Sequence, residues 1–362
     1  MTPERTSNID DIFERIRRHS FHPLNDRNFT VDRELNEDGI ADLDDEDWRI
    51  RVLAIGDLVS GGPAVVESLA DALTDDDVHV RYIAAKAAGV RADEELVDAL
   101  ERVLTDDPRG AVRAQAAMSL GQIGDDKALE SLRHAERADD RDVKHQAELA
   151  IAQIERERPS TDELRDAFAS IDPATFGRVT TGDRAPPISL PDTEGGNWTL
   201  DDADGWTMLI WVFADWCPVC HREFDELIEL RDRFESNSID VVTIECHDVF
   251  RGRVMVGKEL EPAYWFAEGS FHDTYTEQIW WPHLLDRAGS VGATYGIDPF
   301  AFSVHGEYIN RPATVVTDPE GTVRFAYIGT FWGDRPSVEQ VLEMIESERF
   351  EFEHPDRLHP TN

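Results

Sequence analysis

Cysteine and lysine are scarce in this chain: its 362 residues include three cysteines, and only four of its 36 basic residues are lysine. Three cysteines are too few for the disulfide framework that holds small secreted domains together. No apolar run approaches the roughly 20 residues of a membrane-spanning helix, and the N-terminus has no apolar stretch typical of a signal peptide. We therefore expect a cytoplasmic protein with no membrane partner, whose cysteines are mostly reduced.

Positive charge is also scarce. The chain carries 75 acidic residues against 36 basic ones, for a formal net charge of −39. Nucleic acid is excluded as a partner, because phosphate binding needs clustered cations. Such acidity is typical of a halophilic composition, since concentrated salt shortens the range of charge repulsion to about 3 Å near 1 M.

The chain is too long for one compact core, so more than one domain is expected. Residues 1–41 form an acidic N-terminal segment with one short helix. Apolar residues spaced for one helical face place this helix over Ile9–Arg18: Ile9, Ile12, Phe13 and Ile16.

A sequence motif repeats within residues 42–157. Each copy begins with an acidic turn, runs through a helix containing a basic residue and continues into a second apolar helix. The basic residues fall 30, 32 and 31 positions apart: Arg51, Arg81, Arg113 and Lys144. A helix pair of this period cannot bury its apolar face alone, so we expect the copies to stack into an all-α solenoid.

This block resembles the HEAT-like repeats of the phycobilisome-lyase type. The resemblance implies a surface that binds a protein partner, although the block could equally serve only as a spacer or stabiliser. It does not imply lyase chemistry, because such repeats occur widely as scaffolds. Residues 158–176 are predicted to be a linker with a short helix.

A pair of cysteines lies where a buried strand gives way to a helix. The apolar run 208–213 predicts the strand, and the sequence Trp216-Cys217-Pro218-Val219-Cys220 follows it. Pro218 suits the first helical turn, because that turn leaves its N–H groups unpaired anyway. A cysteine at a helix N-terminus is stabilised as the thiolate, which is the form that attacks disulfides. The spacing indicates a thioredoxin-like redox motif.

Residues 177–349 read as strand, helix, strand, an aromatic-rich insertion over 250–282, and then a closing strand pair and helix. This order predicts an α/β thioredoxin-like fold. Residues 350–362 form a tail. The expected fold class is therefore multidomain, with an N-terminal all-α HEAT-like solenoid and a C-terminal α/β thioredoxin-like domain.

Short motifs in this region resemble the redoxin group, which comprises AhpC/TSA-type peroxiredoxins and TlpA-like thiol–disulfide oxidoreductases. They appear in the family's order: Gly182-Asp183-x-Ala185-Pro186, the motif at 216–220, Leu285-Asp286, Tyr295-Gly296, and Arg311-Pro312-Ala313-Thr314. The resemblance implies that Cys217 and Cys220 are catalytic, and that Pro312 is a cis-proline facing them. Trp216, Pro218, Arg311 and Glu223 are expected to support the site.

Two positions depart from the family pattern. Trp211 stands six residues before the first cysteine, where thioredoxin-like proteins often bury a carboxylate, so proton transfer needs another group or water. Cys217 replaces the threonine that peroxiredoxins place three residues before their peroxide-attacking cysteine, which aligns with Cys220.

Other functions of the cysteines remain open from the sequence. Cys217 to His221 also fits the pattern for covalent haem, although a helix start is the wrong setting. Cys217, Cys220, Cys246 and His247 have the ligand types of a zinc site, but only one paired motif is present. Cys246 is either a buried small residue or a third redox thiol. We expect no metal and no cofactor.

The sequence thus predicts an enzyme, a thiol–disulfide oxidoreductase. Cys217, as the more exposed cysteine, would attack a substrate disulfide, and Cys220 would then resolve the mixed disulfide. Its partners would be a protein disulfide and a protein or small-thiol reductant, with a protein partner docked on the repeats. One alternative is a peroxiredoxin-like peroxidase, with Cys220 attacking peroxide. Another is a redox-sensing adaptor without turnover.

Overall fold

The computed structural model describes residues 5–18, 47–138, 140–160, 162–260, 275–300, 302–329 and 333–352. The chain divides into two compact units, each described by itself below. Of the described residues, those within 5–18, 47–174 and 300–308 form the first unit, and those within 175–299 and 309–352 form the second.

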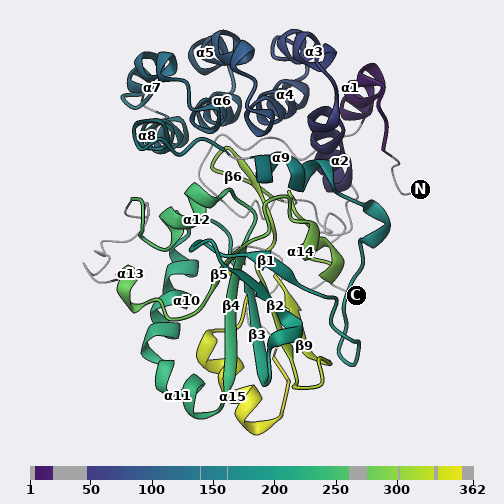
Figure 1. The fold of residues 1–362 in the computed structure, drawn as a ribbon, viewed down its shortest axis with the longest axis vertical. Helices are drawn as coiled ribbons and strands as arrows, with labels where there is room; N and C mark the ends of the chain where they lie inside the picture. Colours follow the sequence, from purple (N-terminus) through teal and green to yellow (C-terminus); the bar gives the residue numbers. More distant parts are fainter. Residues whose placement is uncertain are drawn as a thin grey trace, which may run out of the picture. The chain divides into compact units, whose positions relative to one another are not determined.

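The first unit is helical (Figure 1). Its helices are α1 (Ile9–Arg18), α2 (Asp47–Ser60), α3 (Ala64–Ala72), α4 (Val78–Arg91), α5 (Val97–Asp106), α6 (Gly110–Ile123), α7 (Leu129–Ala135), α8 (Arg141–Glu155) and α9 (Asp162–Ala169). Short 3-10 turns precede α5 and α7: η2 (Glu94–Leu96) and η3 (Asp126–Ala128). The predicted first helix is confirmed.

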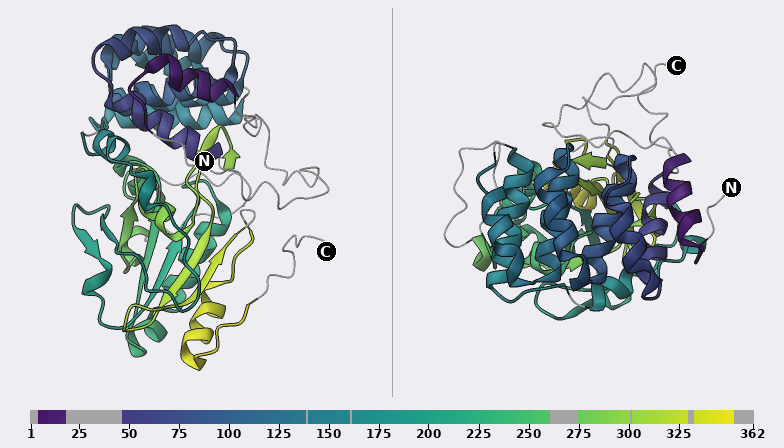
Figure 2. Two further views of the ribbon diagram at one scale, coloured as in Figure 1. Left: turned by 90° about the vertical axis from the view of Figure 1, so that its right-hand side faces the viewer. Right: turned by 90° about the horizontal axis from the view of Figure 1, so that it is seen from above.

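The repeats form two rows of helices. Helices α2, α4, α6 and α8 pack side by side in one row, and α3, α5 and α7 pack against them in a second row, as the two views of Figure 2 show. Small residues allow the close approach within the first row. A Cβ atom added at Gly89 of α4 would lie 2.7 Å from the Cα of Ser119 in α6, so only glycine fits there.

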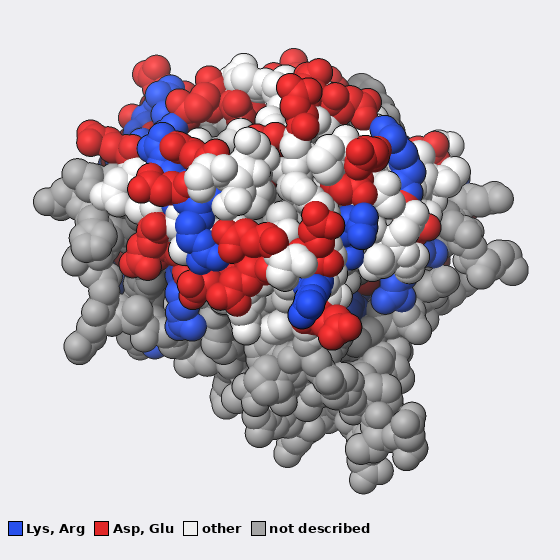
Figure 3. All heavy atoms as spheres, turned by 90° about the horizontal axis from the view of Figure 1, so that it is seen from below, with Lys and Arg blue, Asp and Glu red and all other residues white. Residues whose placement is uncertain are grey.

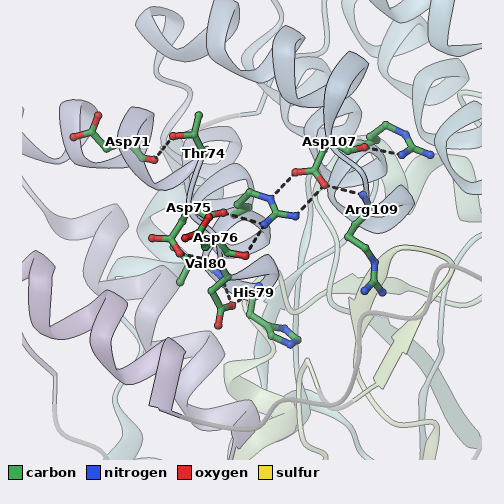
Figure 4. Close-up of polar contacts among 11 residues, drawn as sticks. Asp71, Thr74, Asp75, Asp76, His79, Val80, Asp107 and Arg109 are labelled. Carbon is green, nitrogen blue, oxygen red and sulfur yellow. Dashed lines mark hydrogen bonds and ion pairs between the residues drawn. The ribbon is translucent and has the colours of Figure 1, made fainter.

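The acidic turns and the repeated arginines join consecutive repeats (Figure 4). The Arg81 guanidinium donates to the backbone carbonyls of Asp75 and Asp76 in its own turn and to both carboxylate oxygens of Asp107 in the next turn. Arg113 repeats the pattern one step on, donating to the Asp107 carbonyl and the Asp140 carboxylate. The acidic turns therefore have a structural role, because their carbonyl and carboxylate oxygens bind the arginines that join consecutive repeats.

A short hairpin from late in the sequence belongs to the first unit. It consists of β6 (Phe302–Val304) and β7 (Glu307–Ile309), and residues 300–308 group with the helices rather than with the sequence around them. Sequence reasoning placed this segment within 177–349 and did not anticipate its packing against the repeats.

The second unit contains a five-stranded mixed sheet with the strand order β5-β4-β3-β8-β9 (Figure 1). Strand β3 pairs in parallel with β4 and antiparallel with β8, and β4 pairs in parallel with β5. The strands are β3 (Trp206–Trp211), β4 (Ile239–Glu245), β5 (His283–Leu285), β8 (Ala313–Thr317) and β9 (Val323–Ile328); a separate pair is β1 (Ser189–Pro191) and β2 (Asn197–Thr199).

The helices of the second unit flank this sheet. They are α10 (Pro218–Glu229), α11 (Arg231–Ser236), α12 (Val249–Met255), α13 (Tyr275–Gln278), α14 (Ser290–Tyr295) and α15 (Val338–Ser347), with the 3-10 turn η5 (Leu200–Asp202). The 3-10 turn η4 (Pro173–Thr175) spans the boundary along the chain between the two units. Helix α10 packs beside α15, and α12 packs beside β5. Apolar residues of the central strands, such as Leu209, Val242 and Val315, are fully buried in the core. The predicted strand–helix–strand order and closing strand pair are confirmed, whereas β5 and α14 were not predicted.

Acidic side chains prevail on the face shown in Figure 3, with basic side chains scattered between them. Several basic residues are held by two carboxylates; Arg233, for example, pairs with Glu339 and Glu346. In the part of the chain that the structure describes, no helix is both long and apolar enough to cross a bilayer.

The clamp between repeats gives a stability prediction. Replacing Arg81 with methionine leaves the largely buried Asp107 carboxylate without its guanidinium, and we expect a loss of about 3 kcal/mol in the free energy of unfolding. Arg133→Met is the control, because Arg133 and Glu155 are each 49% exposed and such a pair contributes below about 1 kcal/mol. Urea unfolding followed by helical circular dichroism measures both. Equal losses in the two variants would contradict the structural role of the clamp.

Candidate functional site

The two cysteines lie at the start of α10, as the sequence predicted. Strand β3 ends at Trp211, and Cys217 is the residue that precedes the helix, with Pro218 at its first position. The backbone N–H of Cys217 donates to the carbonyl of Ala214 at 3.0 Å, which forms the tight turn between strand and helix. The thiol of Cys220 accepts a hydrogen bond from the N–H of Phe213 at 3.2 Å. The turn and the helix therefore hold the Cys220 sulfur against a peptide group that follows β3 and place Cys217 at the start of α10.

Both cysteines are buried in this reduced form. Cys217 is 1% exposed and Cys220 is fully buried, so Cys217 is the more exposed cysteine only by a very small margin. Trp216, which precedes the pair, is buried beside Phe213 with its ring edge-on. A reactant therefore reaches either sulfur only when the residues around it move aside, and accessibility does not distinguish the two sulfurs.

Electrostatics distinguishes them instead. Burial raises the pKa of the Cys217 thiol, but a hydrogen bond from Cys220, the positive charge of Arg335 and the N–H groups of Cys220 and Val219 outweigh it, so the pKa is lowered. Burial and the neighbouring Cys217 raise the pKa of the Cys220 thiol well above its usual value. Cys217 is thus the sulfur that ionises first.

Arg335 and Glu223 form a buried ion pair beside Cys220. The Nη1 atom of Arg335 lies 2.5 Å from Oε2 of Glu223 and 3.7 Å from the sulfur of Cys220. Burial raises the pKa of the Glu223 carboxyl to about 8, although Arg335 opposes the shift. The carboxyl stands one helical turn after Cys220 and can take up or release a proton near neutral pH. Trp211 occupies the position where thioredoxin-like proteins often bury a carboxylate, and Glu223 is a buried carboxyl close to Cys220.

The sequence predicted Arg311 as the supporting arginine and did not identify Arg335. Arg311 is largely buried and pairs with Asp298 at 3.3 Å, whereas the guanidinium that reaches the cysteine is Arg335, in the segment before α15. No motif or periodicity marks Arg335 in the sequence, because its position depends on how the chain folds back between β9 and α15.

The loop before β8 also differs from expectation. The Arg311–Pro312 peptide bond is trans, since the described residues contain no cis bond, so the expected cis-proline is wrong. The trans form is the ordinary state of an X–Pro bond, and here the Pro312 carbonyl accepts the N–H of Gly329, which extends the pairing of β8 with β9. Asn310 precedes this loop, and its side-chain amide donates to the carbonyl of Val212 at 3.2 Å.

A second group of buried polar residues supports the other side of the turn. His221 Nε2 lies 2.6 Å from the Asp215 carbonyl oxygen, and burial lowers the pKa of the imidazole to about 4. The Asp215 carboxylate accepts from Arg251 of α12. His221 is thus neutral and committed to the turn, which disfavours the covalent haem reading of the motif.

Cys246 lies immediately after β4 and is 9% exposed. Its neighbour Glu245 is buried near His247 and His283, whose ring nitrogens lie 3.7 and 3.6 Å from its carboxylate. Burial raises the pKa of this carboxyl, but the two imidazoles outweigh it and lower the pKa to about 2. Within the described ranges, no group of three or more His, Cys, Asp or Glu residues is arranged to hold a metal ion. The four residues considered for a zinc site are therefore not brought together as one.

Comparisons with known proteins agree with this geometry. Residues 181–326 match the AhpC/TSA family, and residues 39–117, 66–152 and 103–173 match HEAT repeats. The chain is 24% identical over 166 residues to the thioredoxin-like protein YneN of Bacillus subtilis, covering 46% of this chain and 81% of that one. It is 26% identical over 171 residues to the 1-Cys peroxiredoxin PER1 of Zea mays, covering 47% and 73%.

Two further known proteins are similar to this chain. The thiol-disulfide oxidoreductase ResA of Bacillus subtilis is 24% identical over 152 residues, covering 42% of this chain and 69% of that one. Among solved structures, peroxidoxin BcpB from Mycobacterium tuberculosis matches at 20% identity with a TM-score of 0.37, covering 47% of this chain and 98% of that one.

The second unit is thus a thioredoxin-like domain of the redoxin class. The chain carries an AhpC/TSA redoxin domain together with N-terminal HEAT repeats, and both predicted resemblances are confirmed. At the level of the family, the supported function is thiol-based redox chemistry, as a disulfide oxidoreductase or a peroxiredoxin-like enzyme.

The role of Arg335 can be measured directly. Replacing Arg335 with methionine removes the buried positive charge beside both sulfurs, so we expect the pKa of Cys217 to rise and its alkylation at neutral pH to slow by about tenfold or more. Arg324→Met is the control, because Arg324 is partly exposed and pairs with Asp318 instead. Iodoacetamide labelling followed by mass spectrometry reports the rate at each cysteine. Equal labelling rates at Cys217 in both variants would contradict this role.

Proposed function

We propose that the redoxin domain catalyses thiol–disulfide exchange, with Cys217 as the attacking thiolate and Cys220 as the resolving thiol. This proposal rests on the pKa values of the two thiols, which lie one helical turn apart and are shifted in opposite directions. The pKa of Cys217 is lowered and that of Cys220 is raised. An attacking sulfur must be ionised at rest, whereas a resolving sulfur must stay protonated until the mixed disulfide has formed.

The reaction balances in two steps. The Cys217 thiolate attacks one sulfur of a substrate disulfide, the substrate S–S bond breaks, and the departing sulfur takes a proton. Cys220 then loses its proton and attacks the Cys217 sulfur, which releases the second substrate thiol and leaves Cys217 and Cys220 joined. Two electrons have moved from the enzyme dithiol to the substrate, and an external dithiol reductant restores the enzyme by the reverse exchange.

Glu223 and Arg335 have complementary tasks in this proposal. The Arg335 charge favours the thiolate forms of both cysteines, so it assists first Cys217 and then Cys220. Glu223 accepts the Cys220 proton in the second step, because it is buried next to the same guanidinium nitrogen and its pKa of about 8 is matched to a thiol rather than to an ordinary carboxyl.

A peroxiredoxin-like peroxidase is the second candidate. The AhpC/TSA match, the similarity to a maize 1-Cys peroxiredoxin, and the guanidinium beside Cys220 favour it. The raised pKa of Cys220 opposes it, since peroxide is attacked by a thiolate. Stopped-flow measurement of peroxide consumption decides between the two: consumption that depends on Cys220 alone supports the peroxidase, and consumption far slower than disulfide exchange supports the oxidoreductase.

The substrate that we propose is a protein disulfide, reached in the cytoplasm, without membrane or nucleic-acid partners. A protein partner for the repeats stays part of this proposal, as does adaptation to high salt. The row formed by α3, α5 and α7 is the part of the repeats open to such a partner, since its charged residues, among them Glu67, Asp98 and Glu130, are exposed. A redox-sensing adaptor would bind its partner without turnover, so steady-state disulfide reduction excludes it.

Cysteine variants test the assignment of roles. Cys217→Ser should abolish exchange, because the remaining thiol at Cys220 is protonated and buried. Cys220→Ser should carry out the first step and accumulate a covalent mixed disulfide with a peptide substrate. Cys246→Ser is the matched control and should exchange at the parent rate. A Cys217→Ser protein that exchanges at the parent rate would overturn the assignment.

A pH profile tests the role of Glu223. As the Glu223 carboxyl has a pKa raised to about 8, it is a base only above that pH, and resolution of the mixed disulfide should accelerate as pH rises through about 8. Glu223→Gln should remove that acceleration and slow resolution by about 100-fold at high pH. Glu229→Gln, an exposed position on the same helix, should keep the parent profile. Single-turnover release of the peptide thiol measures the step, and an unchanged profile in Glu223→Gln would exclude this role.

A further inference from the structure

The hairpin segment 300–308 is buried against the first row of repeat helices. Phe300, His305, Glu307 and Tyr308 are all buried, although two of the four are polar or charged. An isolated two-stranded hairpin is marginally stable at best in water. The hairpin therefore depends on the helices for its structure, and its polar residues need matching partners there.

Three helices of the first row, α2, α4 and α8, supply such a partner. Arg51 of α2 donates twice to the Phe300 carbonyl, at 3.1 and 2.7 Å, and its guanidinium lies 4.5 Å from the centre of the Tyr308 ring. The Tyr82 hydroxyl of α4 accepts the Tyr308 N–H at 3.2 Å, and the two rings meet edge to face.

Helices α6 and α8 hold the turn and the second strand. Gln146 of α8 donates its amide to the Glu307 carboxylate, and Asp142 lies 3.0 Å from Nδ1 of His305. At the turn, Gly306 faces α6 with a φ of +77°; a Cβ atom there would lie 3.0 Å from the Cβ of Ala114 and 3.4 Å from the Cα of Ala111. Glycine is favoured here, because the positive φ strains any other residue and a Cβ atom would press on Ala114.

The first repeat has adapted its arginine to this contact. Arg81 and Arg113 occupy equivalent places in the next two repeats and clamp the following acidic turn. Arg51 stands at the same place in the repeat, but its guanidinium donates to the hairpin. Thus the row of α2, α4, α6 and α8 is a specific binding surface for the chain's own segment 300–308.

The chain continues from this hairpin directly into the loop before β8. One residue, Ile309, separates Tyr308 from Asn310. The Asn310 amide donates to the Val212 carbonyl, and the next residue, Phe213, donates its N–H to the sulfur of Cys220. The residue that follows the hairpin by one position therefore contacts the same Val212–Phe213 peptide group that donates a hydrogen bond to the Cys220 sulfur.

We propose that the HEAT repeats position the Asn310–Pro312 loop for a disulfide substrate by clamping the hairpin 300–308. The substrate part of this inference rests on the proposed exchange function, whereas the mechanical part does not. Fixing the far end of a one-residue connection restricts the loop, so the bound peptide does not have to order it. In this proposal the repeats affect substrate binding through the position of the loop. They do not affect the ionisation of Cys217, which depends on Arg335 and the groups around it.

The test releases the hairpin in the full-length chain. Gly306→Leu places a side chain against α6 and should unseat residues 300–308. Gly195→Leu is the matched control, because Gly195 also lies in a turn between two short strands, with a φ of +86°, but a Cβ atom there meets nothing within 4 Å. Both variants thus carry similar backbone strain, and only one collides with a helix.

Three readouts separate the possibilities. In Gly306→Leu, hydrogen exchange should increase over 300–308 and also over 309–312, and KM for a peptide disulfide should rise by about fivefold or more while kcat changes less than about twofold. The rate of Cys217 alkylation should stay at the parent value. The Gly195→Leu protein should match the parent in all three measurements.

A second pair of variants keeps the test valid if Gly306→Leu fails to fold. Arg51→Met removes the donors to the hairpin, and Arg81→Met weakens the repeats at the equivalent position without touching it. The inference is overturned if Arg51→Met speeds hydrogen exchange over 300–308 but leaves hydrogen exchange over 309–312 at the parent rate. It is also overturned if that variant keeps the parent KM for the peptide disulfide. A parent protein that does not reduce the peptide disulfide would contradict the proposed function. Hydrogen exchange over 309–312 in the variants would still show whether the repeats position the loop.

Discussion

A buried guanidinium between a thiol and a carboxyl is the interaction on which the site depends. Arg335 contacts both Cys220 and Glu223 in a region from which water is excluded, so its charge acts on them with little screening. Its effect on the two sulfurs is unequal. Cys217 also receives backbone N–H groups at the start of α10 and a hydrogen bond from Cys220, so its pKa falls, while burial dominates at Cys220. One helix start and one arginine thereby create two thiols with different tasks.

Burial also explains how Glu223 becomes suited to proton transfer. An exposed glutamate would be ionised at neutral pH and a poor proton acceptor for a thiol. Enclosure beside the sulfur raises the pKa of this carboxyl to about 8, despite the adjacent arginine. The strand beneath the cysteines carries Trp211, which has no acid–base function, whereas the buried carboxyl of Glu223 lies on the helix α10, and we propose that it transfers the proton.

The sequence predicted the features that follow from local patterns. The helix Ile9–Arg18, the strand Ala313–Thr317 and the position of the cysteine pair at the start of α10 all follow from apolar periodicity and turn residues. Arg335 could not be predicted, because it lies in an irregular segment and reaches residues more than a hundred positions away. The Pro312 bond was predicted cis from a family pattern, but the pairing of Pro312 with Gly329 is made with a trans bond. The hairpin was missed because polar residues such as His305 and Glu307 are typical of an exposed loop. They are buried here because their partners lie on α8, far away in the sequence.

The measurement that tests the central claim most directly is a site-resolved pH titration of both thiols in the reduced, unmodified chain. Rapid alkylation at a series of pH values, with each cysteine quantified by mass spectrometry, gives a separate midpoint for Cys217 and for Cys220. The structure predicts that Cys217 titrates below its ordinary value of 9.0 and that Cys220 remains protonated well above it. A lower midpoint at Cys220 than at Cys217 would contradict the assignment of attacking and resolving sulfurs.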